Sequence, residues 1–332
     1  MEHATTRTHV LLGFDPGAAG RALIAGVIGD AAPIAILPAG DTAARRTALE
    51  SAAILLTRNS ARDLLPGEAV RLSGARLIQF LPAGIDFIPL GDLPPDVAVA
   101  SNAGAYSAPM AEHALALTLA AAKRLIPEHA ALGRGEFNQT SPNRMLAGMT
   151  AGILGFGGIG QATARLMRAL GMHIHAINRS GTSAQPVDWI GTTAQLDTLL
   201  SASDVVVVSI PLTRATEGLI GARELRLMKP DAILVNLARG EIIDEAALFA
   251  HLQSYPGFTA CIDAWWIEPV RHGRFAMDLP FMSLANVIGS PHNSASVPQT
   301  GQEGLRLAAE NCLRALRGEP VRNLVTAADR YL

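Results

Sequence analysis

Short apolar runs alternate with polar or alanine-rich segments along the first hundred residues. The runs predicted to be strands are Val10–Phe14, Ile34–Leu37, Ala53–Thr57, Leu77–Leu81 and Val97–Ala100. The segments between them have helical character. Because strands that alternate with helices form parallel sheets covered on both faces, this part of the chain predicts an α/β domain.

The same alternation resumes beyond residue 150. The predicted strands there are 152–154, a strand ending at Asn178, Asp204–Ile210, Ala232–Asn236, Thr259–Asp263 and Val287–Gly289. One helix is predicted over 109–126, another from the Asp204–Ile210 strand through Met228, and a last one at about 302–317. Asp244 is predicted to cap the helix that follows it. The Gly/Asn/Pro-rich stretch 133–148 predicts a loop.

Residues 152–179 carry the most specific pattern, in which a strand leads into Gly155-x-Gly157-x-x-Gly160, an amphipathic helix and a second strand. Gly155 permits a tight turn, Gly157 lets the backbone approach a pyrophosphate, and Gly160 lets the helix pack on the strand. The helix N-terminus would face the phosphates with free N–H groups and a positive dipole end. The pattern predicts a dinucleotide site that also includes Gly158 and Ile159.

The end of the second strand indicates which dinucleotide binds. An acidic residue there would take the ribose 2′-hydroxyl of NAD, but this chain has Asn178-Arg179-Ser180. No carboxylate repels a 2′-phosphate at that point, and the guanidinium and the hydroxyl can bind one. We therefore expect NADP to be preferred. The alternative is that Arg179 is a solvated loop residue and that NAD binds without its usual acid.

Three polar residues each follow a predicted strand of the nucleotide sheet, where α/β sheets bind their ligands. Arg239 can hold a carboxylate or polarise a carbonyl through a bidentate fork. His292 can donate the proton that accompanies a hydride. Glu268 can raise the pKa of that histidine and keep it charged. The set suits hydride transfer to an α-keto acid, with a surface ion network as the alternative.

At these residues the chain resembles the D-isomer-specific 2-hydroxyacid dehydrogenases. The resemblance covers nearly the whole chain. The segments that carry it are Gln79–Asp86 (QFLPAGID), Ala111–His113 (AEH), the glycine motif, Pro211–Thr213 (PLT), Leu227–Asp244 (LMKPDAILVNLARGEIID), Glu268-Pro269 and Pro291-His292.

The resemblance implies a role for each matching residue. Arg239 would bind substrate, and His292, paired with Glu268, would be the acid/base. Asp263 would hold the nicotinamide carboxamide. The cofactor site would also include Ile210, Pro211 and Ala238. The backbone of Ala83 and Gly84 would cradle the substrate carboxylate.

The resemblance also implies the architecture: two Rossmann-like parallel-sheet α/β domains, one flavodoxin-like and one dinucleotide-binding, with a cleft between them. Residues 1–101 and 293–332 would form the substrate-binding domain, and residues 102–292 the NAD(P)-binding domain. A homodimer built on the nucleotide domains, with helix 109–126 at the interface, is expected. The expected reaction is NADPH-linked reduction of a small 2-keto acid such as glyoxylate or hydroxypyruvate.

Two other functions are alternatives to NADPH-linked reduction of a 2-keto acid. An NAD-linked phosphoglycerate-type dehydrogenase is disfavoured by Asn178. A dinucleotide-sensing corepressor-like binding protein would call for a basic or disordered tail, and none is visible. The Trp265-Trp266 pair stands where the family has a smaller residue, and it either reshapes the substrate pocket or packs beneath it.

The composition of the chain limits the classes of partner that it is expected to bind. With a net charge of −2, the chain has no basic footprint for nucleic acid. Its two cysteines, Cys261 and Cys312, lie far apart and form no disulfide framework. No apolar run reaches membrane-spanning length and no signal peptide is evident, so a cytoplasmic protein is expected. His113 is expected to be a packed or interface histidine, and His173 with His175 lacks a third metal ligand, so no metal site is predicted.

Overall fold

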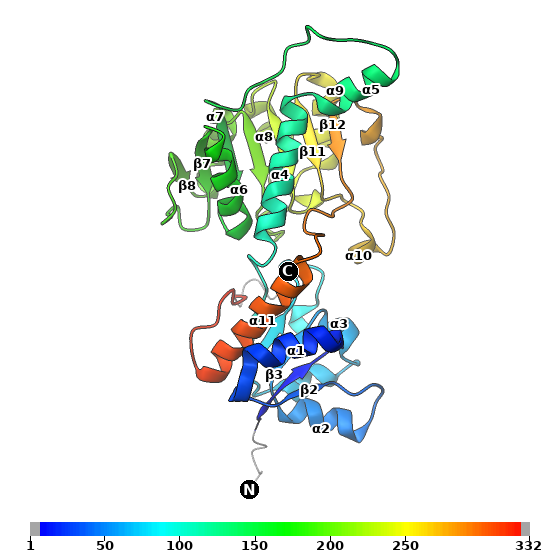
Figure 1. Cartoon of the computed structure of the whole chain (residues 1–332), viewed down its shortest axis with the longest axis vertical. Coiled ribbons are helices and arrows are strands. Elements are labelled where there is room, and N and C mark those ends of the chain that lie inside the picture. Colours follow the sequence, from blue (N-terminus) through cyan, green and yellow to red (C-terminus); the bar gives the residue numbers. More distant parts are fainter. Residues whose placement is uncertain (1–6, 327–332) are drawn as a thin grey trace. The chain divides into compact units, whose positions relative to one another are not determined.

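A computed structural model describes residues 7–326 of the chain, which divide into two compact units (Figure 1). The first comprises the described residues up to Ala105 and from Val297 onward. The second is Tyr106–Ser296. Each unit is built on its own parallel sheet, so the predicted α/β fold class with two parallel-sheet domains is confirmed.

The first unit has a five-stranded parallel sheet in the order β2-β1-β3-β4-β5. Its strands are β1 (His9–Leu12), β2 (Ile34–Ile36), β3 (Ala52–Thr57), β4 (Leu77–Phe80) and β5 (Ala98–Ala100). Its helices are α1 (Gly17–Ile28), α2 (Ala43–Ser51), α3 (Ser60–Asp63) and α11 (Thr300–Arg317). Leu305 and Cys312 of α11 are buried against Val10 and Ile54 of the sheet. The C-terminal helix thus packs on the N-terminal sheet.

The second unit has a seven-stranded parallel sheet in the order β12-β11-β10-β9-β6-β7-β8. Its strands are β6 (Thr150–Leu154), β7 (His173–Ile177), β8 (Trp189–Gly191), β9 (Val205–Val208), β10 (Ile233–Asn236), β11 (Thr259–Ile262) and β12 (Val287–Gly289). Its helices are α4 (Ser107–Ala122), α5 (Leu125–Gly133), α6 (Gly158–Ala169), α7 (Leu196–Ala202), α8 (Ala222–Leu227), α9 (Glu245–Ser254) and α10 (Pro269–His272).

The central strands of this sheet are buried on both faces, which is why they read as continuous apolar runs such as the four valines of β9. Helices α4 and α6 share one apolar core with the sheet, and α7, α8 and α9 share the core on its other face. The strand order reverses between β6 and β9. A ligand of an open α/β sheet binds at such a reversal, beyond the carboxyl ends of the strands.

Two helices of the structure have bounds that differ from those predicted from the sequence. Helix α4 ends at Ala122, not at 126, because Arg124 adopts a left-handed conformation (φ 53°). Pro127 then lies in the first turn of α5, where its missing N–H costs nothing, whereas within a continuous helix it would break the ladder. The helix predicted through Met228 is reduced to α8, because residues 211–221 are not helical; 214–218 form turns and Ile220 forms a bridge with Ile243.

Candidate active site

The glycine motif forms the turn between β6 and α6. Gly155 has φ +106°, and a Cβ there would lie 2.6 Å from the backbone nitrogen of Ile210. A Cβ on Gly160 would lie 2.2 Å from the carbonyl oxygen of Gly155. In contrast, a Cβ on Gly157 would meet nothing within 4 Å. Gly155 and Gly160 are therefore required by packing, whereas the side of Gly157 is open to a ligand.

The start of α6 fits the pyrophosphate of a dinucleotide. Gly157 caps the helix without a side-chain hydrogen bond, and both Gly157 and Gly158 are exposed. The first amide groups of a helix lack partners within the helix, and the dipole favours an anion at that end. Ile159, half-buried, follows directly, and exposed Pro211 follows the buried Ile210.

Asn178 closes the turn that follows β7. Its Oδ1 accepts a hydrogen bond from the Gly181 amide at 2.7 Å, and its Nδ2 donates to the Thr182 carbonyl at 2.8 Å. The side chains of Arg179 and Ser180 are exposed in this turn. An aspartate at position 178 could still accept from Gly181, but it has no proton to donate to Thr182. Asn178 therefore fixes the backbone that carries Arg179 and Ser180.

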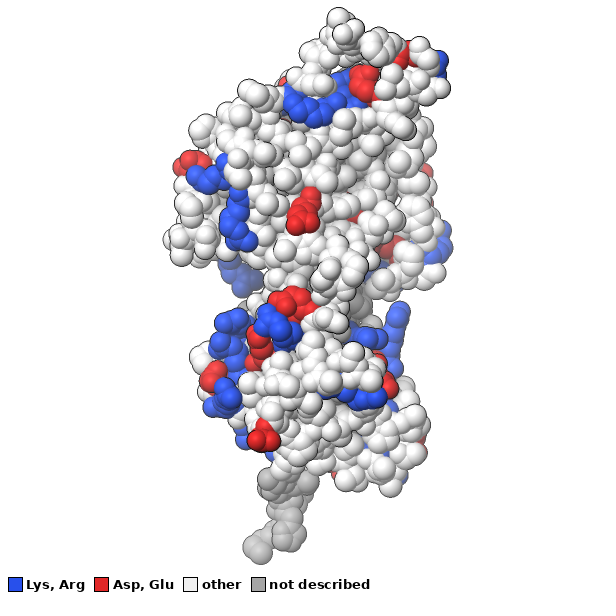
Figure 2. Space-filling model, in the orientation of Figure 1, with Lys and Arg blue, Asp and Glu red and all other residues white. Residues whose placement is uncertain are grey.

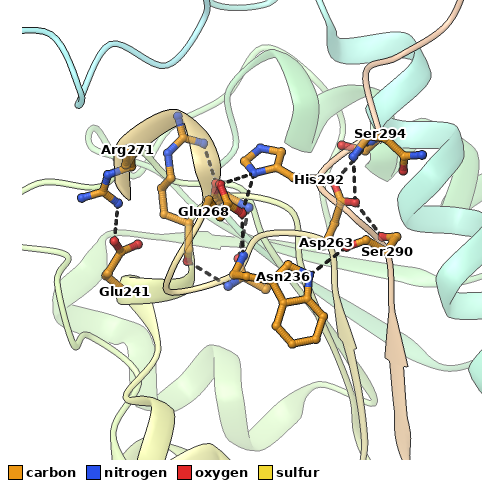
Figure 3. A network of polar contacts seen from close by, with 12 residues as sticks. Asn236, Glu241, Asp263, Glu268, Arg271, Ser290, His292 and Ser294 are labelled. Atoms are coloured by element: carbon orange, nitrogen blue, oxygen red, sulfur yellow. Dashed lines mark hydrogen bonds and ion pairs between the residues drawn. The ribbon is translucent and has the colours of Figure 1, made fainter. Parts of the chain in front are cut away.

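Glu268 and His292 form a close pair (Figure 3). Nδ1 of His292 lies 2.8 Å from each carboxylate oxygen of Glu268, and the Trp265 amide donates to Oε1 at 2.7 Å. Burial raises the pKa of Glu268, but the hydrogen bonds from His292 and Trp265 and the charge of Arg239 outweigh it and hold that pKa below its usual value. The carboxylate is therefore ionised and can stabilise a protonated imidazole.

Arg239 lies just beyond β10, on a loop that Asn236 holds. Asn236 donates from Nδ2 to the Arg239 carbonyl at 2.8 Å and accepts from the Ala238 amide at 3.1 Å. The Arg239 side chain is partly buried and donates to the Ala238 carbonyl at 2.7 Å. The charge of Arg239 lowers the pKa of Glu268, so Arg239 lies near the Glu268–His292 pair, and the catalytic roles of the three residues stay a prediction.

Asp263 forms a second cluster beside this pair. Its carboxylate is fully buried and accepts a hydrogen bond from Ser290 Oγ at 2.6 Å. It also receives the backbone amides of Asn293 at 3.3 Å and Ser294 at 3.4 Å. His113 of α4 reaches the same cluster, with Nε2 3.0 Å from Ser290 Oγ and 3.6 Å from Asp263 Oδ1.

His113 and Ser290 are not among the site residues that the sequence predicts. The sequence predicts a packed or interface histidine at position 113; in the structure its ring is half-buried and its Nε2 lies 3.0 Å from Ser290 Oγ. The signal that pointed to the site was its place in the AEH segment of a helix covering the nucleotide sheet. Ser290 directly follows β12, so its position at a strand end was the available clue.

The two tryptophans pack around Phe281. Trp266 stacks on Phe281 with ring centroids 5.2 Å apart, and its Nε1 donates to the Ile243 carbonyl. Trp265 is 6% exposed, and its Nε1 donates to the Ser290 carbonyl at 2.8 Å. Both indoles thus have apolar neighbours for the ring and an acceptor for the N–H, which favours the packing role for the pair.

The substrate contacts predicted at Ala83 and Gly84 belong to the first unit. Ala83 and Gly84 follow β4 in the first unit and are partly exposed; as substrate contacts they stay a prediction. His175 lies against the Trp189 ring at 5.7 Å, while His173 is exposed. Among residues 7–326 no group of three or more His, Cys, Asp or Glu side chains is arranged to hold a metal ion. No helix in that part of the chain is long and apolar enough to span a bilayer.

Comparison with known proteins agrees with this geometry. Residues 115–294 match the family model described as D-isomer specific 2-hydroxyacid dehydrogenase, NAD binding domain. The chain is 33% identical over 287 residues to a glyoxylate reductase from Aeropyrum pernix, covering 82% of this chain and 81% of that protein. It is 34% identical over 231 residues to a D-3-phosphoglycerate dehydrogenase from Archaeoglobus fulgidus, covering 69% of this chain but only 43% of that enzyme.

The fold also matches a solved structure over nearly its full length. A D-isomer specific 2-hydroxyacid dehydrogenase from Xanthobacter autotrophicus, crystallised with NADPH and MES, superposes with a TM-score of 0.78 at 26% identity. The match covers 98% of this chain and 100% of that one.

Proposed function

The chain belongs to the D-isomer-specific 2-hydroxyacid dehydrogenase family, and we propose that it reduces a small 2-keto acid such as glyoxylate or hydroxypyruvate with NADPH. The observation that carries the proposal is the Glu268–His292 pair with Arg239 beside it, on the same sheet as the glycine turn. Such an arrangement supplies an anion-binding group and a proton donor where a dinucleotide would end.

Each residue has a role in the proposed reaction. A bound reduced dinucleotide supplies the hydride that adds to the carbonyl carbon. Arg239 holds the substrate carboxylate and orients the carbonyl. His292 gives its Nε2 proton to the carbonyl oxygen, which becomes the hydroxyl of the product. Glu268 stabilises the charged imidazole before the transfer and holds its orientation afterwards.

The cofactor site would comprise the glycine turn, Ile210, Pro211, Ala238, the 178–180 turn and Asp263, which would accept from the nicotinamide carboxamide. The preference for NADP rests on charge, because Arg179 and Ser180 are exposed where a 2′-phosphate would lie and position 178 carries an asparagine in place of an acid. The solved relative from Xanthobacter autotrophicus, crystallised with NADPH, supports the same choice.

We also propose a homodimer. Five large apolar side chains between 125 and 145 are each more than half exposed: Leu125, Ile126, Leu132, Phe137 and Met145. In Figure 2 most side chains on the face of the second unit around α4 are uncharged. An exposed apolar segment next to a helix face with few charges suits a second copy of the chain. Light scattering coupled to size exclusion tests this, and a monomer at micromolar concentration would contradict it.

The function is tested by following the absorbance of reduced nicotinamide with NADPH and NADH in parallel. The substrates are glyoxylate, hydroxypyruvate, pyruvate, phenylpyruvate and 3-phosphohydroxypyruvate. Turnover of glyoxylate or hydroxypyruvate with NADPH is expected. Turnover confined to NADH and the phosphorylated acid would favour a phosphoglycerate-type enzyme. The similarity to the Archaeoglobus fulgidus D-3-phosphoglycerate dehydrogenase is the observation that supports this alternative. NADPH binding without any turnover would instead favour a dinucleotide-sensing protein.

A further inference from the structure

The loop that presents His292 is held from one side by Asp263. His292 has φ 50°, a left-handed conformation that a residue with a Cβ seldom adopts without support. The two amides that follow it, those of Asn293 and Ser294, point at the two carboxylate oxygens of Asp263. Ser290, two residues before it, donates its hydroxyl proton to the same carboxylate (Figure 3). Asp263 therefore fixes the loop on both sides of His292.

Asp263 depends in turn on His113. The Ser290 hydroxyl has one proton, and at 2.6 Å that proton is engaged with Asp263 Oδ1. The oxygen of this hydroxyl must then act as the acceptor in its 3.0 Å contact with His113 Nε2, so Nε2 carries a proton. In the described part of the chain no Lys or Arg side chain forms an ion pair with Asp263, and His113 is the only ring nitrogen that approaches it. His113 is thus the donor that orients Ser290 and faces the buried carboxylate.

We propose that His113 is a positioning residue for His292. It acts through Ser290 and Asp263, which set the backbone of the 290–294 loop, and it touches neither substrate nor cofactor. The helix that carries it is suited to this task, because α4 is a sixteen-residue helix whose buried side chains pack on the sheet that also carries β11 and β12. A rigid helix thereby fixes the proton donor of the site. This inference rests on the proposed function in naming His292 as that donor.

A role confined to packing α4 on the sheet is the alternative. Met110, Ala114 and Leu117 already bury that helix face, whereas the His113 ring is 25% exposed and directs its nitrogen at Ser290. A packing residue would be replaced best by an apolar side chain. A hydrogen-bond donor would be replaced best by glutamine, whose amide nitrogen can occupy the place of the imidazole Nε2. The two roles therefore predict opposite orders of tolerated substitutions.

The experiment compares His113→Ala, His113→Leu and His113→Gln with His129→Ala, which removes an exposed histidine of α5. The first readout is the NMR signal of the His292 Nδ1 proton in protein labelled at histidine with ¹⁵N, assigned by its loss in His292→Ala. In wild type and His113→Gln we expect a low-field, slowly exchanging signal from the Glu268 hydrogen bond. In His113→Ala and His113→Leu we expect it to broaden or shift, and in His129→Ala to stay unchanged.

The second readout is turnover. His113→Ala and His113→Leu should lower kcat about tenfold to a hundredfold, the scale of a misplaced catalytic group. His113→Gln should restore most of kcat. Because His113 and Ser290 act in one chain, adding Ser290→Ala to His113→Ala should cost little more than either change alone.

An unaltered His292 signal with unaltered kcat in His113→Ala would overturn the inference. So would a better recovery with leucine than with glutamine. If wild type reduces no 2-keto acid at all but its His292 signal still responds to His113→Ala, the proposed reaction fails and the positioning role stands.

Discussion

Nδ1 of His292 lies 2.8 Å from both carboxylate oxygens of Glu268, so one ring nitrogen contacts both oxygens of a buried acid. This contact leaves Nε2 as the nitrogen that can face a ligand. The Glu268 side chain is 10% exposed and that of His292 is 32% exposed. The carboxylate is thus shielded while the imidazole still reaches solvent, which is the arrangement a proton donor needs.

Removing the imidazole should abolish most turnover without loss of the cofactor. In His292→Ala we expect kcat to fall by about 10²–10⁴-fold, the range for loss of a general acid, and the NADPH Kd to stay near that of wild type. Stopped-flow turnover and fluorescence titration measure the two quantities. His173→Ala, which removes an exposed histidine of β7, serves as the control. Wild-type turnover in His292→Ala would remove this residue from the mechanism.

Arg179 should decide between the two dinucleotides. Replacing it by aspartate removes a cation and places a carboxylate where it can accept from a ribose hydroxyl and repel a 2′-phosphate. We expect Arg179→Asp to lower the ratio of kcat/KM for NADPH to that for NADH by about tenfold or more, since charged contacts of this kind carry that scale of free energy. Arg226→Asp, at an exposed position of α8, should leave the ratio unchanged. A constant ratio in both variants would refute the charge argument.

Asn178→Asp makes a sharper test of the same turn. Its side chain would keep an acceptor for the Gly181 amide but lose the donation to the Thr182 carbonyl. We therefore expect a shift toward NADH together with a lower melting temperature. Kinetic ratios and differential scanning calorimetry separate the two effects. A shift in Asn178→Asp with no change in melting temperature would show that the Thr182 contact contributes nothing to the turn.

The strands could be predicted from the sequence because parallel strands buried on both faces leave continuous apolar runs, as in β9 and β10. The three-residue edge strand β8 leaves no such run, since Trp189 and Ile190 are only partly buried. The end of α4 could not be read either, because the left-handed residue that stops it is an arginine with no glycine-like signal. The local sequence pattern therefore predicts the central strands of the sheet better than its edge strand or the ends of the helices.

The site, too, has a part that the sequence predicts and a part that only the structure reveals. Arg239, Glu268 and His292 could be brought together from sequence because each follows a strand of one parallel sheet, and such strands end at one edge. The contact between His113 and Ser290 spans 177 residues and depends on how α4 lies on the sheet. No spacing rule along the chain contains that orientation, so only the packed structure reveals it.

Trp266 should act on stability more than on substrate choice. Trp266→Phe keeps an aromatic ring on Phe281 but removes the hydrogen bond to the Ile243 carbonyl, so we expect a loss of about 1 kcal/mol. Trp266→Ala should cost about 3–5 kcal/mol by opening a cavity. Urea unfolding measures both, and relative kcat/KM across the acid panel is expected to change little in Trp266→Phe. A changed order of preferred acids in that variant would place the indole in the pocket.

His251 should make the fold sensitive to mild acid. Burial lowers the pKa of this imidazole, which lies between Tyr255 and Phe258 with its Nε2 buried and without a hydrogen bond. Its pKa in the folded chain therefore lies below the unfolded value of about 6.5. Above that pH both states are neutral at this position and the stability contribution is constant. As the pH falls below it, the unfolded chain binds a proton that the folded chain refuses, so stability is lost until the lower folded pKa is passed.

Comparing melting temperatures at several pH values isolates this contribution. His251→Leu keeps an apolar filling between the two rings and removes the titrating group, so its melting temperature should fall less between neutral and mildly acidic pH than that of wild type. The carboxylates that also titrate in acid are common to both proteins and cancel in the difference. His129→Leu changes an exposed histidine of α5 and should leave the wild-type pH dependence in place. If His251→Leu and His129→Leu lose stability equally as the pH falls, burial of His251 is not what couples protonation to unfolding.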